Sequence, residues 1–202
     1  MPAGARCCYV VAHGAGAGMA HPFMASVAAE LAVRRIATLR YQFPYMESGS
    51  RRPDPPALAQ ATVRAAVAAA ARLAPGLPLI AGGKSFGGRM TSQAQAAAPL
   101  AAVQGLAFLG FPLHPANKPS DARATHLADV AVPLLFLQGT RDALADLALL
   151  RPVVDGLGPR ATLVLFDDAD HSFHVPARTG RKDADIRREM IDAFAAWAER
   201  VI

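Results

Sequence analysis

The chain has 202 residues, 52% of them hydrophobic and 18% charged, which is enough apolar material for a full core and excludes the composition of a disordered protein. The net charge of +5 comes mostly from arginines spread along the chain, without the blocks of like charge or interleaved aromatic residues of a nucleic-acid-binding surface. The N-terminal residues lack the pattern of a signal peptide and no apolar stretch is long enough to span a bilayer, so we expect a cytoplasmic protein with no membrane partner.

Short apolar runs bounded by Gly, Pro or Asp alternate with longer Ala-rich stretches, a pattern typical of buried parallel strands between helices. The alternation predicts the α/β class, as one domain over residues 1–202, with a doubly wound, mostly parallel sheet of about six strands and helices on both faces. Because only about twenty residues separate the fourth strand from the fifth, we expect no separate cap domain. The expected strands are residues 8–12, 36–41, 79–82, 103–109, 134–138 and 162–166, and the expected helices are residues 22–33, 55–73, 86–98, 146–157 and 183–201.

Several local signals refine these elements. Cys7 and Cys8 are adjacent, so a disulfide between them would be strained and we expect free thiols. Asp54 is a suitable cap for the second helix, with Pro55 at its first position, whereas Pro152 interrupts the pattern of the fourth helix. The last helix carries an apolar face that suits docking on a sheet, formed by Ile186, Met190, Ile191, Phe194, Trp197, Ala198 and Val201.

After the third strand the chain reads GGKSFGGRM, which places Ser85 at a sharp strand-to-helix turn between Gly83 and Gly87. A nucleophile elbow needs this arrangement, because the serine backbone is strained and side chains at the two flanking positions would collide with neighbouring strands. The alternative is that Ser85 only caps the following helix, a role that serine often fills.

A serine hydroxyl needs a neighbouring base, which a third group holds in the correct tautomer. Asp142 follows the fifth strand in the string QGTRD, and His171 follows the sixth in DDADHSFH, in the chain order serine, acid, histidine that this type of sheet requires. Asp146 is a rival acid that resembles a helix cap, and His174 is a rival base that lies beyond the turn. We therefore expect Ser85, Asp142 and His171 to form a catalytic triad.

The first strand leads into the string HGAGAGMAHPFM, whose small residues allow a backbone to approach a substrate closely. Acyl transfer requires two backbone N–H groups at the oxyanion, and we expect them from Ala15 and Phe86. A glycine-rich turn without a catalytic role is the alternative. We expect His13 to order this loop. We also expect a substrate-binding set formed by His13, Phe43, Tyr45, Phe111 and His114. The alternative is that these side chains only pack the long loops.

Other ligand classes fit the sequence poorly. Gly83-Lys84-Ser85 imitates the end of a phosphate-binding loop, but Pro78 stands where that motif requires glycine. The glycines of residues 14–18 do not have dinucleotide-binding spacing either. Asp167, Asp168 and Asp170 crowd one loop without further metal ligands at suitable spacing. We expect no metal site and no cofactor.

The strings HGAGAGMAHPFM, FPYM, GGKSFGGRM, GFPLHP, QGTRDAL and ADHSFHV occur in this order over nearly the whole chain. In these strings the chain resembles a family of small bacterial α/β-hydrolases related to dienelactone hydrolases, with homologous domains in a subunit of a eukaryotic chromatin acetyltransferase complex. The resemblance implies the α/β-hydrolase fold and the triad Ser85, Asp142 and His171. Dienelactone hydrolases proper use cysteine at the position of Ser85, so their substrate is not carried over.

We expect a carboxylesterase-like serine hydrolase that acts on a small ester, thioester or lactone through an acyl-enzyme on Ser85. Its partner would be a small acyl substrate and not a nucleic acid. The alternative is a non-catalytic binding or scaffold protein built on the same fold, because fold does not determine function.

Overall fold

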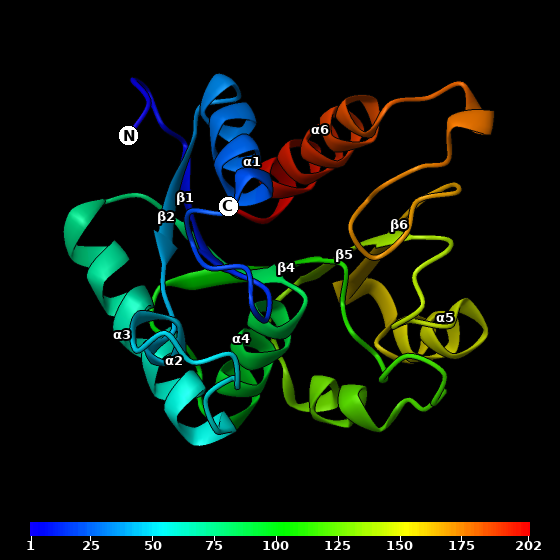
Figure 1. The fold of residues 1–202 in the computed structure, drawn as a ribbon. Coiled ribbons are helices and arrows are strands. Elements are labelled where there is room, and N and C mark those ends of the chain that lie inside the picture. The colour runs from blue at the N-terminus through cyan, green and yellow to red at the C-terminus, as the bar shows by residue number, and fades with distance from the viewer.

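The computed structural model describes residues 1–202 and contains one six-stranded sheet in the order β2-β1-β3-β4-β5-β6 (Figure 1). Every neighbouring pair of strands is parallel, which confirms the α/β class. The strands are β1 (Cys7–Ala12), β2 (Ile36–Tyr41), β3 (Leu79–Lys84), β4 (Val103–Leu109), β5 (Leu134–Gly139) and β6 (Ala161–Phe166).

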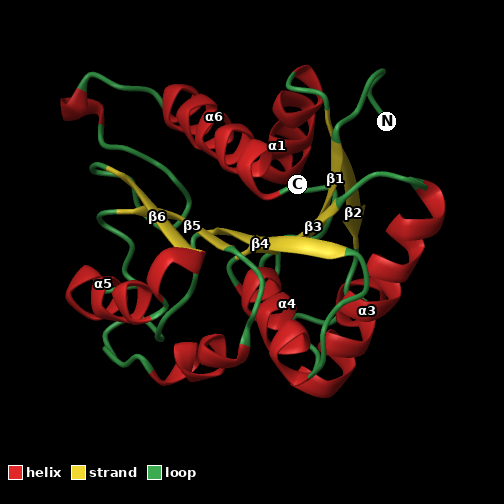
Figure 2. Ribbon diagram, turned by 180° about the vertical axis from the view of Figure 1, so that it is seen from behind, coloured by secondary structure: helices red, strands yellow, loops and turns green.

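Helices cover both faces of this sheet. Figure 2 shows α1 and α6 on one face and α3, α4 and α5 on the other. The α-helices are α1 (Pro22–Val33), α2 (Pro44–Glu47), α3 (Pro56–Leu73), α4 (Phe86–Ala97), α5 (Leu147–Gly156) and α6 (Asp183–Val201), and the 3₁₀-helices are η1 (Ala122–Asp129), η2 (Gly158–Arg160) and η3 (Ala177–Thr179). None of the helices is both long and apolar enough to cross a membrane.

Each face of the sheet has its own hydrophobic core. The core under α3, α4 and α5 contains 31 buried residues, and the core under α1 and α6 contains 22. Every residue of β1 and β5 is buried, which explains why these strands read as continuous apolar runs and not as alternating ones. The apolar face expected on α6 is confirmed, since Ile186, Met190 and Phe194 are fully buried against the sheet.

The strand order places a topological switch point between β1 and β3. The chain runs from β1 outward to β2, returns across to β3, and then proceeds outward to β6. Ligands of open α/β sheets bind where the order reverses, outside the carboxyl ends of the strands. The pairing of Ala12 with Gly83 brings the loop after β1 beside the turn after β3.

The structure corrects some local predictions. Helix α3 begins at Pro56 with Pro55 as its N-cap, so the prediction that Asp54 caps this helix was wrong. Asp54 instead accepts a hydrogen bond of 3.2 Å from the backbone N–H of Tyr45. The long loops also contain short helices, α2 and η1, that the sequence pattern did not indicate.

Candidate active site

Ser85 occupies a sharp turn between β3 and α4 with φ at 49°, a left-handed conformation that is strained for a serine. A Cβ added at Gly83 would lie 2.3 Å from the carbonyl oxygen of Ala12, and a Cβ at Gly87 would lie 2.5 Å from that of His13. Both flanking positions therefore require glycine. Ser85 makes no side-chain capping hydrogen bond to α4, so its hydroxyl is available for another partner.

That partner is His171. The Oγ of Ser85 lies 2.8 Å from the Nε2 of His171, and the Nδ1 of the same ring lies 2.6 Å from the Oδ2 of Asp142. A carboxylate only accepts hydrogen bonds, so Nδ1 carries the proton and Nε2 is free to accept from the serine hydroxyl. The structure thus brings Ser85, His171 and Asp142 into one hydrogen-bonded line from three separate loops.

The carboxylate of Asp142 is buried and has three donors. Its Oδ2 accepts from His171 and, at 2.5 Å, from the Nε2 of Gln138, and its Oδ1 accepts at 2.7 Å from the backbone N–H of Leu144. Gln138 is itself fully buried, and its Oε1 accepts from the N–H of Phe111 at 2.9 Å. Sequence reasoning missed Gln138, although it lies in the QGTRD string four residues before Asp142.

A tight turn presents His171 to the serine. The Oδ1 of Asp170 accepts from the backbone N–H groups of Ser172 at 2.7 Å and His174 at 3.0 Å, which closes the turn around the histidine. Asp170 therefore has a structural role in this loop. The structure contains no group of three or more His, Cys, Asp or Glu residues arranged to hold a metal ion.

The rival acid and base have other partners. Asp146 is the N-cap of α5 and accepts from the N–H of Ala148 at 2.8 Å. The Nδ1 of His174 lies 2.9 Å from the carboxylate of Asp183, on the exposed surface at the start of α6. The structure brings neither Asp146 nor His174 into the line of Ser85.

The loop after β1 lies against the serine. A Cβ added at Gly14 would lie 3.7 Å from the Cβ of Ser85, and Ala15 lines the same cavity as Ser85. The N–H of Ala15 donates to no other backbone or side-chain group. Phe86 is the first residue of α4, where the N–H has no acceptor within the helix. Both N–H groups expected at an oxyanion are thus placed near Ser85.

A cavity of about 410 Å³ opens beside this line of residues. Apolar side chains from α1 and from the loop after β5 form much of its wall. Sequence reasoning did not single out Phe23, Met24 or Leu144, although they end the strings HGAGAGMAHPFM and QGTRDAL. The lining residues are Gly14, Ala15, Ala17, His21, Phe23, Met24, Lys84, Ser85, Leu144, His171 and Ser172.

The structure does not place the five expected substrate-binding side chains in this cavity. His13, Phe43 and Phe111 are fully buried, and Tyr45 and His114 are 3% exposed. These side chains instead support the loops around the site, because apolar rings in long loops gain more by packing than by exposure.

His13 shows how this support works. Its Nδ1 donates to the carbonyl of Gly14 at 2.8 Å, and its Nε2 accepts from the N–H of Phe43 at 3.1 Å. Burial lowers the pKa of His13, which favours the neutral ring that this acceptor role requires. The Tyr45 hydroxyl accepts from the N–H of Gly16 at 3.0 Å. Together these bonds order the loop after β1, as expected for His13.

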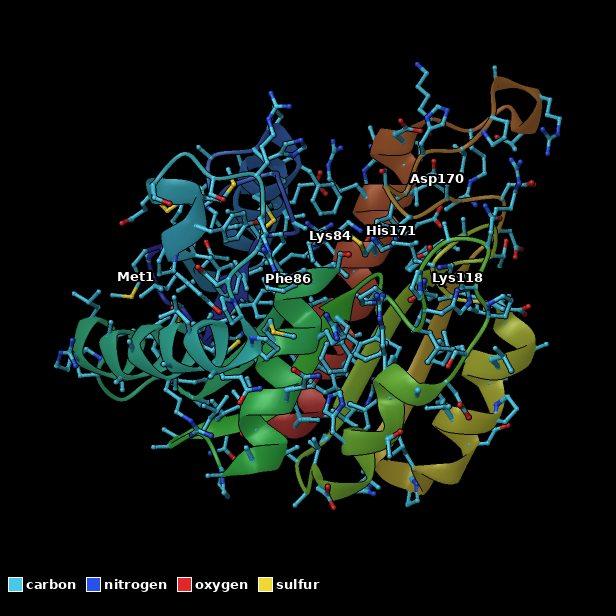
Figure 3. All side chains as sticks on the ribbon, turned by 60° about the horizontal axis from the view of Figure 1, so that its bottom comes forward. Met1, Lys84, Phe86, Lys118, Asp170 and His171 are labelled. Carbon is cyan, nitrogen blue, oxygen red and sulfur yellow. The ribbon has the colours of Figure 1, made fainter.

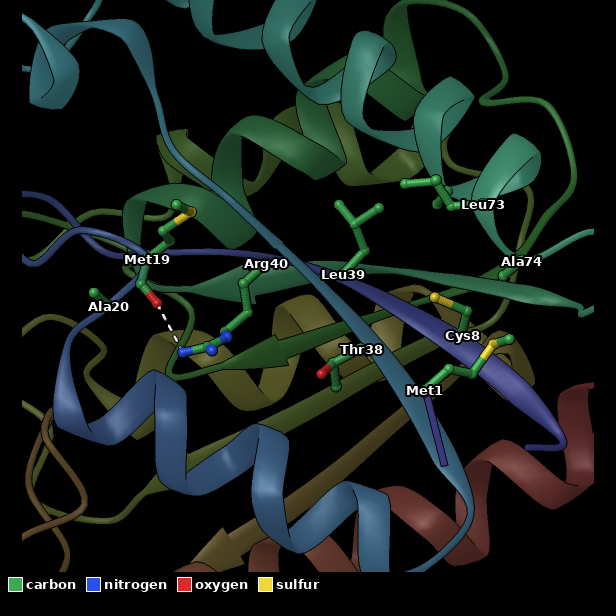
Figure 4. Close-up of a pocket in the computed structure, with 11 residues that line it drawn as sticks. Met1, Cys8, Met19, Ala20, Thr38, Leu39, Arg40, Leu73 and Ala74 are labelled. Carbon is green, nitrogen blue, oxygen red and sulfur yellow. Dashed lines mark hydrogen bonds between the residues drawn. The ribbon is translucent and has the colours of Figure 1, made fainter. Parts of the chain in front are cut away.

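A second cavity, of about 450 Å³, lies along the edge strand β2 and away from Ser85 (Figure 4). It is mostly apolar, and its one arginine, Arg40, donates to the carbonyl oxygen of Met19 at 3.0 Å. Cys8 also lines it, but burial raises the pKa of this thiol, so it is a poor nucleophile. This cavity contains no nucleophile paired with a base.

The fold and this geometry can be compared with known proteins. A family model described as an alpha/beta hydrolase domain matches residues 5–199. An α/β serine hydrolase without a lid from Xanthomonas campestris is 23% identical, with a TM-score of 0.73 over 96% of this chain and 83% of that chain. A dienelactone hydrolase from Anabaena variabilis is also 23% identical, with a TM-score of 0.75 over 100% of this chain and 87% of that one. An esterase domain from Rhodothermus marinus is 15% identical, with a TM-score of 0.74 over 99% and 90% of the two chains.

At these identities the likeness to solved structures concerns the fold alone, and it confirms the expected α/β-hydrolase fold without a cap domain. No curated protein matches the sequence. The relation to a eukaryotic chromatin acetyltransferase subunit stays a prediction.

Proposed function

Because this chain belongs to the alpha/beta hydrolase domain family, we propose that it is a serine hydrolase whose nucleophile is Ser85, with His171 as base and Asp142 as the group that orients it. The observation that carries this proposal is the unbroken line of hydrogen bonds of 2.8 Å and 2.6 Å from Ser85 through His171 to Asp142. The line ends in the serine hydroxyl, at the wall of a cavity of about 410 Å³.

In the proposed reaction the Oγ of Ser85 attacks a carbonyl carbon while the Nε2 of His171 takes the hydroxyl proton. The N–H groups of Ala15 and Phe86 hold the negative oxygen of the tetrahedral intermediate. His171 then gives the proton to the leaving group, which departs and leaves an acyl-enzyme. Water, deprotonated by the same imidazole, attacks this acyl group, and the proton returns to Ser85 as the acid is released.

The cavity supports a small acyl substrate, such as an ester, thioester or lactone. Its wall combines apolar side chains, among them Phe23, Met24 and Leu144, with polar groups near the serine. No cap domain covers it, since the segment between β4 and β5 holds only the 3₁₀-helix η1. This volume is in the ordinary range of small-molecule pockets.

The test is labelling with a fluorophosphonate probe together with turnover of short p-nitrophenyl esters. We expect wild type to be labelled at Ser85 and to release p-nitrophenol, and Ser85→Ala to do neither while unfolding at the same temperature. A second serine variant, Ser172→Ala, is the control, because Ser172 lines the cavity while the Nε2 of His171 is hydrogen-bonded to Ser85. Its labelling should match that of wild type.

The competing function is a non-catalytic binding or scaffold protein on the same fold. Absence of probe labelling at Ser85 and absence of ester turnover in folded wild type would favour it.

We also propose that residues 1–202 act as one domain, because each core joins elements from both halves of the chain. The cytoplasmic location stays a prediction.

A further inference from the structure

Lys84 is a titratable side chain at the cavity that has no role in the proposed reaction. It is the last residue of β3, directly before Ser85, and its Nζ donates a hydrogen bond of 2.5 Å to the backbone carbonyl oxygen of His171. Figure 3 shows Lys84 and His171 next to each other. Lys84 takes part in no ion pair. An ammonium group withdrawn from water without a carboxylate partner costs free energy, so another benefit must offset this cost.

The surroundings of Lys84 are shaped for a long side chain. A Cβ added at Gly14 would lie 3.4 Å from the Cγ of Lys84, and a Cβ added at Gly110 would lie 3.1 Å from its Nζ. The stem therefore borders the cavity, while the ammonium group reaches between Gly110 and the His171 loop. The ring of Phe173 lies 5.6 Å from Nζ and faces it, which is a favourable contact for a cation.

The ammonium group of Lys84 is hydrogen-bonded to His171, the residue of this loop whose side chain must be placed accurately. The carboxylate of Asp170 binds the N–H groups of Ser172 and His174, so it closes the loop on itself but does not join it to the strand of the nucleophile. No backbone N–H of a loop or turn donates to the carbonyl oxygen of His171. Its bond from Lys84 links the histidine directly to β3, which also presents Ser85.

We infer that Lys84 is a positioning residue, whose ammonium group ties the His171 loop to β3 and so holds the imidazole between Asp142 and Ser85. This inference rests on the proposed function of the same site. Lys84 does not contact the reacting atoms. It acts through its hydrogen bond to the backbone carbonyl of His171. Displacement of a reacting group by about 1 Å can cost on the order of a hundredfold in rate, so a tether of this kind has a measurable effect.

The tether also predicts a dependence on pH. The charges that act on Nζ are the carboxylates of Asp142 and Asp170, and the imidazole of His171 lies beside Gly110, as Nζ does. Burial lowers the pKa of Lys84 to about 8, against the opposing effect of these carboxylates. A charged donor forms a stronger hydrogen bond than a neutral amine, so the tether weakens as Lys84 loses its proton. The rate of reaction at Ser85 should therefore fall on the alkaline side of this pKa.

The experiment measures the rate of fluorophosphonate labelling at Ser85 from pH 6 to about 10, a range that brackets the pKa of about 8, for wild type, Lys84→Met and Lys118→Met. Lys118 is exposed, so its substitution removes the same charge without touching the His171 loop. We expect Lys84→Met to label roughly tenfold to a hundredfold more slowly at its plateau and to lack the alkaline decline. Lys118→Met should reproduce the wild-type rate and profile.

A wild-type rate and profile in folded Lys84→Met would overturn the positioning role and leave the proposed function intact. No labelling of Ser85 in wild type would overturn the proposed function, and the positioning role with it. If Lys84→Met does not fold, the wild-type profile decides, because the absence of an alkaline decline near pH 8 contradicts a tether that titrates with a pKa of about 8.

Discussion

The Nε2 of Gln138 donates a hydrogen bond of 2.5 Å to the Oδ2 of Asp142, and both side chains are buried at the end of β5. The same oxygen of Asp142 accepts from His171, so Gln138 fixes the carboxylate that orients the imidazole. Gln138 also accepts the N–H of Phe111 at the end of β4, and this joins the acid to the neighbouring strand. This side chain therefore supports both the site and the fold.

Replacement of Gln138 by leucine should lower both turnover and stability. It leaves the buried N–H of Phe111 without a partner, which costs about 1–3 kcal/mol, and it removes one of the two donors to the Oδ2 of Asp142. Ester turnover should fall by roughly tenfold or more because the imidazole is less well oriented. Gln104→Leu is the control, since Gln104 is the exposed residue of β4. Equal kcat and equal unfolding midpoints in the two variants would contradict this role.

Asp142→Asn should keep the fold and lose most of the activity. Asparagine fills the same space, but its amide group can force the wrong histidine tautomer, which costs about 10⁴ in kcat in serine enzymes with this constellation. The comparison is Asp146→Ala, which should lose about 1 kcal/mol of stability through the missing cap of α5 and keep its turnover. A wild-type kcat in Asp142→Asn would move the acid to another residue.

Gly87→Ala should destabilise the protein, because the new Cβ would lie 2.5 Å from both the carbonyl oxygen of His13 and the Cβ of Ala12. Overpacking of this kind costs about 1–3 kcal/mol, and the shift it forces would also move Ser85. Gly156→Ala is a matched helical control, with no atom within 4 Å of its added Cβ. Urea unfolding and probe labelling should show losses in Gly87→Ala alone. Equal midpoints would mean that the elbow can relax without cost.

The sequence was sufficient for the strands and for the nucleophile turn because both depend on local chemistry. Buried parallel strands require apolar runs, and the close approach of β1 requires glycine on each side of Ser85. Asp142 and His171 could be placed because the carboxyl ends of parallel strands meet at one edge of the sheet. Their roles in catalysis stay predictions, although the structure brings their side chains together.

The rest depends on contacts between segments far apart in the chain. Lys84 bonds the carbonyl of His171, 87 residues away in the loop after β6, and Gln138 bonds the N–H of Phe111, 27 residues away. No local pattern encodes either contact. Phe43 and Phe111 follow strands and looked suited to a pocket, but the structure buries both. The cap of α3 was mispredicted because Asp54 found a better-placed donor in the N–H of Tyr45.

His126 should make the protein less stable in mild acid. The Nε2 of His126 lies 2.7 Å from the Oγ of Ser92, and burial, with the charge of Arg89, lowers the pKa of His126 to about 4. A histidine whose pKa is lowered by folding is favoured in its neutral form, so its stabilising effect is complete above the unfolded value of about 6.5 and disappears as the pH falls toward 4.

The loss should be on the order of 1 kcal/mol, because solvent screens the partly exposed ring and reduces the full effect of the pKa shift. Urea unfolding of wild type and His126→Gln at pH 7 and pH 5 measures it. The stability of wild type should fall more between these values than that of the variant, which cannot titrate at this position. A difference of the opposite sign would show that His126 gains a proton more readily in the folded state than in the unfolded one.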